Sequence, residues 1–230
     1  MGRALIFIAD PLCAWSWGFA PVLREVVDQT GLAVHLMVGG LTAGPRAARL
    51  DASGQAELRM RWARVAEATG QAFDAEAFQR MAGASWLHDS GPACRAVIAL
   101  RAQHPSAALA YLADLQDAFC VRGRDVTDRA VLIEVAQRHA RDPARFAEEL
   151  DDPTLVQAAQ QEFQEVRDLG IQGFPTLFLR DRSEWGLAAR GWQAVGPLLD
   201  SIQAWLDKRD AEEAHDLRTY GQPSGLTRRR

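Results

Sequence analysis

The chain has few cysteines and no long apolar run. Three cysteines among 230 residues, Cys13, Cys94 and Cys120, are too few and too scattered for a disulfide framework. No apolar segment approaches the roughly 20 residues that span a bilayer. The apolar run over 4–9 is followed at once by structured-looking sequence, without the cleavage site of a secretory signal. We therefore expect no membrane partner and a cytoplasmic location.

Clustered positive charge and metal-binding patterns are also lacking. The formal net charge is −4, and the one basic run, 228–230, is too short and too terminal to bind nucleic acid. The five histidines show no metal-binding spacing, and no cysteine pair or carboxylate cluster accompanies them. No glycine-rich loop resembles a phosphate cradle. The sequence thus predicts no nucleic-acid partner, no metal and no tightly bound cofactor.

The start of the chain has a strand–helix–strand pattern. Residues 4–9 are continuously apolar, as in a strand buried on both faces of a sheet. Apolar residues at helical spacing follow over 19–27, and Gly31 stands where a helix cap belongs. Over 33–38 apolar residues occupy alternate positions, as in a second strand. Sites in such sheets gather beyond the carboxyl ends of the strands, which is where Cys13 lies.

The middle of the chain has a different pattern. From about 45 to 168 the periodicity is almost wholly helical, with a strong start signal at Asp152-Pro153. Strand patterns return at 176–179 and 184–190, and a last amphipathic helix follows. Residues 209–230 have charge, proline and glycine but no period, which predicts a disordered tail.

These patterns together predict an α/β protein with a thioredoxin fold, in which a large all-helical domain is inserted between the βαβ and ββα halves. We expect a discontinuous thioredoxin-like domain over 1–44 and 169–208. The inserted helical domain is expected over 45–168, and the tail over 209–230.

The segment from Asp10 to Pro21, DPLCAWSWGFAP, carries the most specific motif. It resembles the active-site segment of DsbA-like thiol–disulfide oxidoreductases, particularly the cytoplasmic branch with FrnE. GPACRAV at 91–97, GRDVTD at 123–128 and GFPT at 173–176 resemble the same branch, in the right order over residues 4–207. The resemblance implies a thioredoxin fold and redox chemistry on protein thiols and disulfides, or with glutathione as co-substrate.

The chain departs from that family at one position. The family has C-x-x-C, whereas here Cys13-Ala14-Trp15-Ser16 gives C-x-x-S. An internal disulfide between the two positions is therefore excluded, and a dithiol cycle would need Cys94 or Cys120 as its second thiol. Ser16 is either natural or was introduced to trap a mixed disulfide.

Cys13 is the candidate nucleophile. A thiol at a helix N-terminus meets unpaired N–H groups and the positive end of the helix dipole, which favour the thiolate. The family geometry implies that the Ser16 hydroxyl donates a hydrogen bond to it. Attack on a disulfide then gives a mixed disulfide, which an external thiol such as glutathione must release. Trp15 and Trp17 flank Cys13 in a turn, which favours a reactive cysteine over a structural one and predicts substrate contact.

Phe174-Pro175 is the second element of the candidate site. Thioredoxin folds carry a cis-proline opposite the active sulfur, and the GFPT segment resembles that loop. Proline offers no N–H, and the backbone before it can pair with an extended substrate. The alternative is an ordinary trans proline at the start of an edge strand.

Three further residues have two interpretations each. Asp10 could accept a proton or tune the thiolate, and a turn before Pro11 explains it equally well. Ser90 belongs to a family segment that can line a glutathione or peptide groove, although a plain helix N-cap suffices. Cys94 shares an apolar helical stripe, typical of the core, and could alternatively be the resolving thiol. Cys120 is expected to be structural.

Three functions fit these observations. The first is a thiol–disulfide oxidoreductase or isomerase that works through Cys13. The second is a glutathione-dependent transferase or isomerase, as in kappa-class glutathione transferases and hydroxychromene carboxylate isomerases, which generally have a hydroxyl in place of Cys13. The third is a non-catalytic peptide-binding module, supported by Ser16 and the tryptophans. The retained cysteine favours the first.

Overall fold

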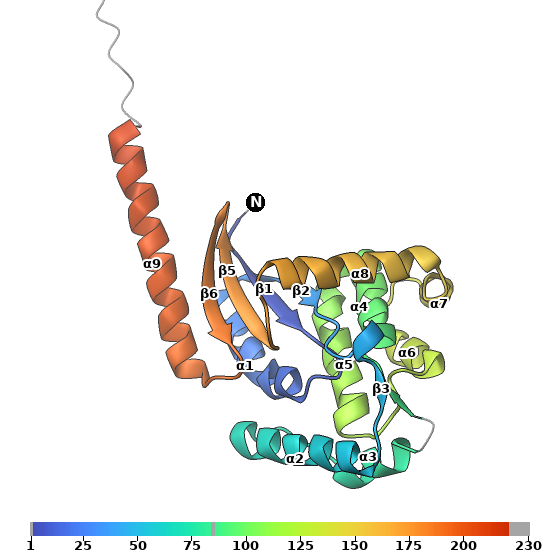
Figure 1. Ribbon diagram of the computed structural model, residues 1–230. Helices are drawn as coiled ribbons and strands as arrows, with labels where there is room; N and C mark the ends of the chain where they lie inside the picture. The colour runs from blue at the N-terminus through green and yellow to red at the C-terminus, as the bar shows by residue number, and fades with distance from the viewer. Residues whose placement is uncertain (1, 84–85, 221–230) are drawn as a thin grey trace, which may run out of the picture.

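The computed structural model describes residues 2–83 and 86–220, which form a four-stranded sheet and a group of helices (Figure 1). The strand order is β2-β1-β5-β6. Strand β1 (Ala4–Ala9) is parallel to β2 (Ala33–Val38) and antiparallel to β5 (Thr176–Asp181), which pairs antiparallel with β6 (Glu184–Arg190). The first and last parts of the chain thus share one sheet, which confirms the thioredoxin fold.

Every residue of β1 is buried, because its side chains alternate between the two faces of the sheet and helices cover both faces. Leu5 and Phe7 face the main core, which includes residues of α1 (Ala14–Thr30) and α9 (Val195–Tyr220). Ile6 and Ile8 face the other way and pack with Val166 of α8 (Pro153–Asp168). The candidate site therefore lies at the end of a strand that is packed on both sides.

The segment between β2 and β5 is mainly helical, as expected for the insertion, although the boundaries at 45 and 168 stay a prediction. In chain order it contains η1 (Gly44–Arg46), β3 (Ala48–Arg49), α2 (Ala52–Thr69), α3 (Ala75–Met81), β4 (Leu87–His88), α4 (Gly91–Gln103), η2 (Pro105–Ala107), α5 (Ala108–Cys120), α6 (Arg129–Ala136), α7 (Pro143–Glu149) and α8. Strands β3 and β4 form a short antiparallel pair that the helical pattern did not predict. Aspartate side chains accept N–H bonds at the starts of α2, α3, α6, α7 and α8, which fixes where these helices begin.

A shielded ion pair fastens the helices to the sheet edge. Glu162 of α8 pairs with Arg101 of α4 through two hydrogen bonds of 3.0 and 2.5 Å, and its side chain is 10% exposed. The same carboxylate accepts the N–H of Val38 at 2.7 Å, and Arg101 donates to the carbonyl of Leu36 in β2. One acid–base pair therefore joins two helices to the edge strand of the sheet.

The expectation of a disordered tail from residue 209 is wrong for residues 209–220, because α9 continues to Tyr220. Its last turns carry good helix formers, and ion pairs attach them to the sheet. Arg3, just before β1, pairs with Asp210 at 2.6 Å, and Arg182, in the turn between β5 and β6, pairs with Glu213 at 2.5 Å. In Figure 1 the far end of the helix extends past the turn that joins β5 to β6. The rest of the expected tail, 221–230, lies outside the described residues.

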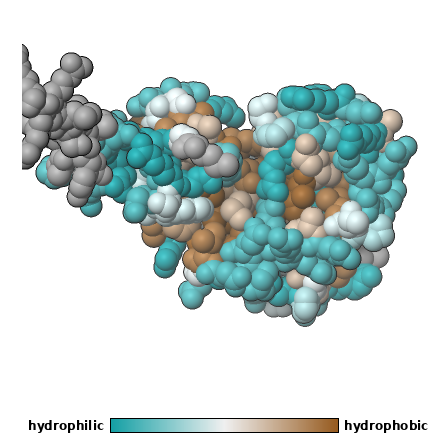
Figure 2. All heavy atoms as spheres, turned by 90° about the horizontal axis from the view of Figure 1, so that it is seen from above, coloured by the Kyte–Doolittle hydropathy of each residue, from teal (hydrophilic) through white to brown (hydrophobic). Residues whose placement is uncertain are grey.

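The face seen from above in Figure 2 has apolar atoms gathered in its middle, bordered by hydrophilic residues. Within 2–83 and 86–220, no helix has the length and apolarity of a membrane span.

Candidate functional site

A tight turn places Cys13 at the first residue before α1. The N–H of Cys13 donates to the carbonyl of Asp10 at 3.1 Å, and the Asp10 side chain accepts the N–H of Leu12 at 2.9 Å. Cys13 occupies the N-cap with extended backbone, and its carbonyl accepts the N–H of Trp17. The Asp-Pro sequence after a buried strand therefore sets the cysteine at the positive end of a 17-residue helix.

The loop before β5 brings Phe174 and Pro175 to this cysteine from 161 residues away. The Phe174–Pro175 peptide bond is cis, as the family resemblance implied. The Cys13 thiol donates to the carbonyl of Phe174, with 3.5 Å between Sγ and O. Gly39 makes room for the loop, because a Cβ at that position would lie 1.8 Å from the Phe174 ring. The sulfur thus faces the carbonyl that precedes the cis-proline.

Burial raises the pKa of the Cys13 thiol above its ordinary value, since only 7% of the residue is exposed. The Ser16 side chain and the N–H groups of Ser16 and Trp15 lower the pKa, whereas the charge of Asp10 raises it further. The expectation that the helix N-terminus gives a net preference for the thiolate is therefore wrong for this structure. Desolvation outweighs the helix N-terminus.

Ser16 lies one turn into α1 and is 1% exposed. Its hydroxyl makes no hydrogen bond to any group in the described part of the chain, yet it favours the charged form of Cys13. The Cys13 thiol has one proton and donates it to the carbonyl of Phe174. Its sulfur becomes a strong acceptor for the Ser16 hydroxyl only when it loses that proton and becomes a thiolate. The geometry makes Ser16 a donor held ready for the thiolate.

Asp10 connects the cysteine to a buried polar network. Its carboxylate accepts the N–H of Leu12 and, at 2.6 Å, the N–H of Leu41. Cys94 donates to the same carboxylate at 3.5 Å, and Gln116 donates to the Asp10 carbonyl at 3.3 Å. Burial raises the pKa of Asp10, and the two N–H bonds lower it in part. Asp10 thus both builds the turn and places a carboxyl group behind the thiol.

Sequence reasoning missed two parts of this network. Gln116 is 1% exposed in α5, and the available signal was a polar residue within the apolar stripe of that helix. The segment 39–42 carried no site prediction, although the N–H of Leu41 donates to Asp10 and the N–H of Thr42 donates to Ser90.

Ser90 stands at the N-cap of α4 but makes no side-chain cap bond, so its interpretation as a plain cap is wrong. Asp89 takes that place by accepting the N–H of Gly91 at 2.8 Å. Ser90 and Thr42 instead exchange two bonds: the Ser90 hydroxyl accepts the N–H of Thr42, and the Thr42 hydroxyl accepts the N–H of Ser90. Ser90 is fully buried and holds the loop after β2 against α4.

The two tryptophans of the motif have different surroundings. Trp15 is 38% exposed beside Cys13. Trp17 is half-buried, and its indole N–H donates to the carbonyl of Ala72 at 3.0 Å, while Gln71 donates to its carbonyl. Trp15 is therefore available to a substrate, whereas Trp17 anchors the connection between α2 and α3.

The other two cysteines are free and buried. Burial raises the pKa of Cys94 well above its ordinary value, and the charge of Asp10 raises it further. Burial also raises the pKa of Cys120 strongly, followed by the effect of the Cys13 charge. Both thiols stay protonated near neutral pH in this arrangement. A resolving role for Cys94 stays a prediction.

The described residues contain no group of three His, Cys, Asp or Glu side chains able to hold a metal. Burial lowers the pKa of His88 to about 4, so this imidazole is neutral at physiological pH.

The chain belongs to the DSBA-like thioredoxin domain family, whose model matches residues 4–196. Among curated relatives, the ClpXP adapter protein SpxH of Halalkalibacterium halodurans is 25% identical over 193 residues, covering 79% of this chain and 60% of the relative. The protein of the same name from Bacillus subtilis is 24% identical, in a match that covers 81% of this chain and 62% of the relative. The chain thus spans about three fifths of the length of these relatives.

Solved structures are similar over nearly the whole chain. A structure described as a candidate protein disulfide isomerase from Nitrosomonas europaea has a TM-score of 0.81 and 29% identity, covering 90% of this chain and 99% of the other. The cytosolic disulfide reductase DsbM from Pseudomonas aeruginosa has a TM-score of 0.70 and 28% identity, covering 91% and 99%. A 2-hydroxychromene-2-carboxylate isomerase, 17% identical with a TM-score of 0.60, shares the fold.

Proposed function

We propose that this protein is a thiol–disulfide oxidoreductase or isomerase that acts through one nucleophilic cysteine, Cys13. The observation that carries the proposal is the position of its sulfur, at the start of α1 and 3.5 Å from the carbonyl before the cis-proline. The two most similar structures named above are a candidate disulfide isomerase and a disulfide reductase, which supports the same chemistry. Protein disulfides and glutathione are the proposed substrates, in the cytoplasm.

The proposed step is a disulfide exchange. The Cys13 thiolate attacks one sulfur of a disulfide R–S–S–R, forms a Cys13–S–S–R bond and releases R–S⁻. Ser16 stabilises the attacking thiolate, and Pro175 with the Phe174 backbone positions the extended substrate. A second thiol, such as glutathione, attacks the mixed disulfide and restores Cys13. No net oxidation occurs when the incoming and leaving thiols have the same redox level, which suits an isomerase or a deglutathionylating enzyme.

The Ser16→Cys variant tests this proposal directly. A cysteine at position 16 would restore C-x-x-C at the start of α1, and we expect the variant to gain dithiol activity in insulin reduction or oxidative refolding. The matched control is Ser16→Ala, which should gain none. Absence of any gain, in a variant that folds as the wild type does, would count against a substrate groove of the oxidoreductase kind.

A non-catalytic peptide-binding function is the second candidate, and the raised pKa of Cys13 favours it. The SpxH relatives are named as protease adapters, a role that requires binding of another protein rather than turnover. Protection of a client from aggregation that survives Cys13→Ala, without any disulfide exchange by the wild type, would select this function over the first.

A further inference from the structure

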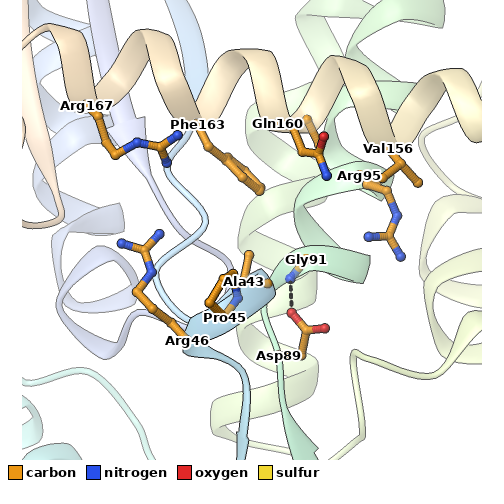
Figure 3. Close-up of a pocket in the computed structure, with 12 residues that line it drawn as sticks. Ala43, Pro45, Arg46, Asp89, Gly91, Arg95, Val156, Gln160, Phe163 and Arg167 are labelled. Atoms are coloured by element: carbon orange, nitrogen blue, oxygen red, sulfur yellow. Dashed lines mark hydrogen bonds between the residues drawn. The ribbon is translucent and has the colours of Figure 1, made fainter.

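A pocket next to the candidate site lies one loop away from Cys13, between η1, the start of α4 and α8. Its volume is about 560 Å³. Figure 3 shows Phe163 directed into the space between Arg46 and Arg167 on one side and Arg95 on the other. The pocket is open to solvent and is separate from the contacts that hold Cys13.

The charge of this pocket is opposite to that of the whole chain. Three arginines, Arg46, Arg95 and Arg167, line it together with a single acid, Asp89, whereas the chain carries a net charge of −4. Within the described part of the chain, none of the three arginines forms an ion pair. Arg46 donates to the carbonyl of Gly40 at 2.6 Å, and Arg167 donates to the side chain of Gln164. The guanidinium groups therefore retain donors and positive charge for a ligand.

The wall between the arginines is apolar. Val156 of α8 is 41% exposed, although valine is usually buried, and it borders the pocket with Pro45 and the partly covered ring of Phe163. An occupant that covers this wall must carry an apolar group as well as negative charge.

A short chain of contacts connects the pocket to the thiol. The Phe174 ring, whose carbonyl accepts from Cys13, packs on Gly39. The next residue, Gly40, packs on the Phe163 ring and accepts the bond from Arg46. A polypeptide whose cysteine reaches Cys13 would therefore have its flanking residues next to the pocket.

We infer, on the basis of the nucleophilic role proposed for Cys13, that this pocket selects substrates in which the reacting cysteine is flanked by an acidic peptide segment with an apolar side chain. Arg95, Arg167 and Arg46 bind the carboxylates, and the wall of Val156 and Phe163 binds the apolar side chain. Glutathione carries carboxylates but no apolar side chain, so the pocket favours a protein segment over the free tripeptide.

The test compares three peptides that share a cysteine activated as a mixed disulfide and a leucine, with flanking Asp and Glu, Gln, or Lys residues. The rate at which Cys13 forms the peptide disulfide is followed by mass spectrometry. At low salt the acidic peptide should react fastest. Arg95→Gln and Arg167→Gln should each slow the reaction of the acidic peptide about fivefold. Raised salt should reduce the preference.

The matched control is Arg64→Gln, an equal charge change at an exposed position of α2 outside the pocket. It should leave the preference for the acidic peptide unchanged. Equal rates for the acidic and lysine peptides, an equal loss in Arg64→Gln, or competition by glutathione as strong as that of the acidic peptide would each overturn the inference.

Two readouts separate this inference from the proposed function. Bis(hydroxyethyl) disulfide has no charge and needs no pocket, so its reaction with Cys13 reports the nucleophile alone. Binding of a cysteine-free acidic peptide, measured by fluorescence anisotropy, reports the pocket alone. If the acidic peptide binds but Cys13 does not react with bis(hydroxyethyl) disulfide, the proposed function is wrong while the peptide site remains. If Cys13 reacts but the acidic peptide does not bind, only the peptide site is wrong.

Discussion

At the scale of single residues, the balance of forces on one sulfur decides the chemistry. A helix N-terminus stabilises a negative charge by about 0.3–1 kcal/mol, whereas full burial can shift a pKa by as much as 3–5 units. Cys13 has both influences, and burial has the larger effect. The proposed exchange would therefore proceed at neutral pH through a minor thiolate population, which Ser16 increases and the Asp10 charge decreases.

The two neighbours of the thiol should shift its pKa in opposite directions. Ser16→Ala removes a group that favours the thiolate, so the pKa of Cys13 should rise. Asp10→Asn removes a negative charge and should lower it. The measurement is the rate of alkylation of Cys13 by iodoacetamide as a function of pH, in variants in which Cys94 and Cys120 are replaced. Shifts of the same sign in both variants would contradict this electrostatic picture.

Asp10 should also make stability depend on pH. Its folded-state pKa is raised, so folding favours the protonated carboxyl group. Stability should therefore fall as pH rises from the unfolded-state pKa, about 3.9, through the higher folded-state pKa. Urea unfolding across this range should show a smaller decline in Asp10→Asn, and an equal decline would locate the effect in other groups.

Gly39 controls the position of the cis-proline loop. Gly39→Ala would place a methyl group inside the Phe174 ring, so the ring and its carbonyl must move away from Cys13. We expect exchange activity to fall at least tenfold, because the Phe174 and Pro175 backbone that positions the substrate would move out of hydrogen-bonding distance. Gly173→Ala is the matched control in the Cys13-facing loop, since a Cβ there meets no atom within 4 Å. Equal activity of the two variants would refute the role of Gly39.

At the scale of elements, local signals in the sequence predicted the strands and several helix ends. The Asp152-Pro153 signal begins α8, and Gly31 caps α1 in the left-handed conformation. The missed features depend on distant contacts. Ser90 bonds Thr42 rather than its own helix, and the polar end of α9 is held by ion pairs to Arg3 and Arg182.

The ion pair between Glu162 and Arg101 should matter more for stability than any exposed pair. Glu162→Ala leaves the guanidinium unpaired and the N–H of Val38 without its acceptor. We expect the free energy of unfolding to fall by roughly 2–4 kcal/mol, below the cost at fully buried pairs because Arg101 is 27% exposed. Glu57→Ala removes an exposed ion pair with Arg61 and should lower the free energy of unfolding by less than about 0.5 kcal/mol. Urea unfolding measures both, and similar values would contradict the structural role.

At the scale of the whole molecule, the site exists only because the two ends of the chain share one sheet. β1 and α1 supply Cys13, and the loop before β5 supplies Phe174 and Pro175. Sequence periodicity predicted the two halves, and only the family resemblance predicted that Pro175 is cis and faces the sulfur. Periodicity could not do so, because a contact between residues 161 positions apart leaves no local pattern.

The insertion gives the site its surroundings. It supplies Cys94, Ser90 and Gln116 to the network behind Asp10, and α8 supplies Arg167 and Phe163 to the arginine-lined pocket beside the loop after β2. The pattern of the sequence predicted that this block is helical but not which of its side chains reach the site, since that depends on how the helices pack.

The most direct measurement is the location of the mixed disulfide. The reduced, folded protein is treated with oxidised glutathione over a range of pH, and the modified residue is identified by peptide mass spectrometry. We expect one glutathione, on Cys13, at a rate that rises with pH beyond the ordinary range of cysteine, and no adduct in Cys13→Ser. Modification of Cys94 or Cys120 while Cys13 stays free would contradict the assignment of Cys13 as the nucleophile.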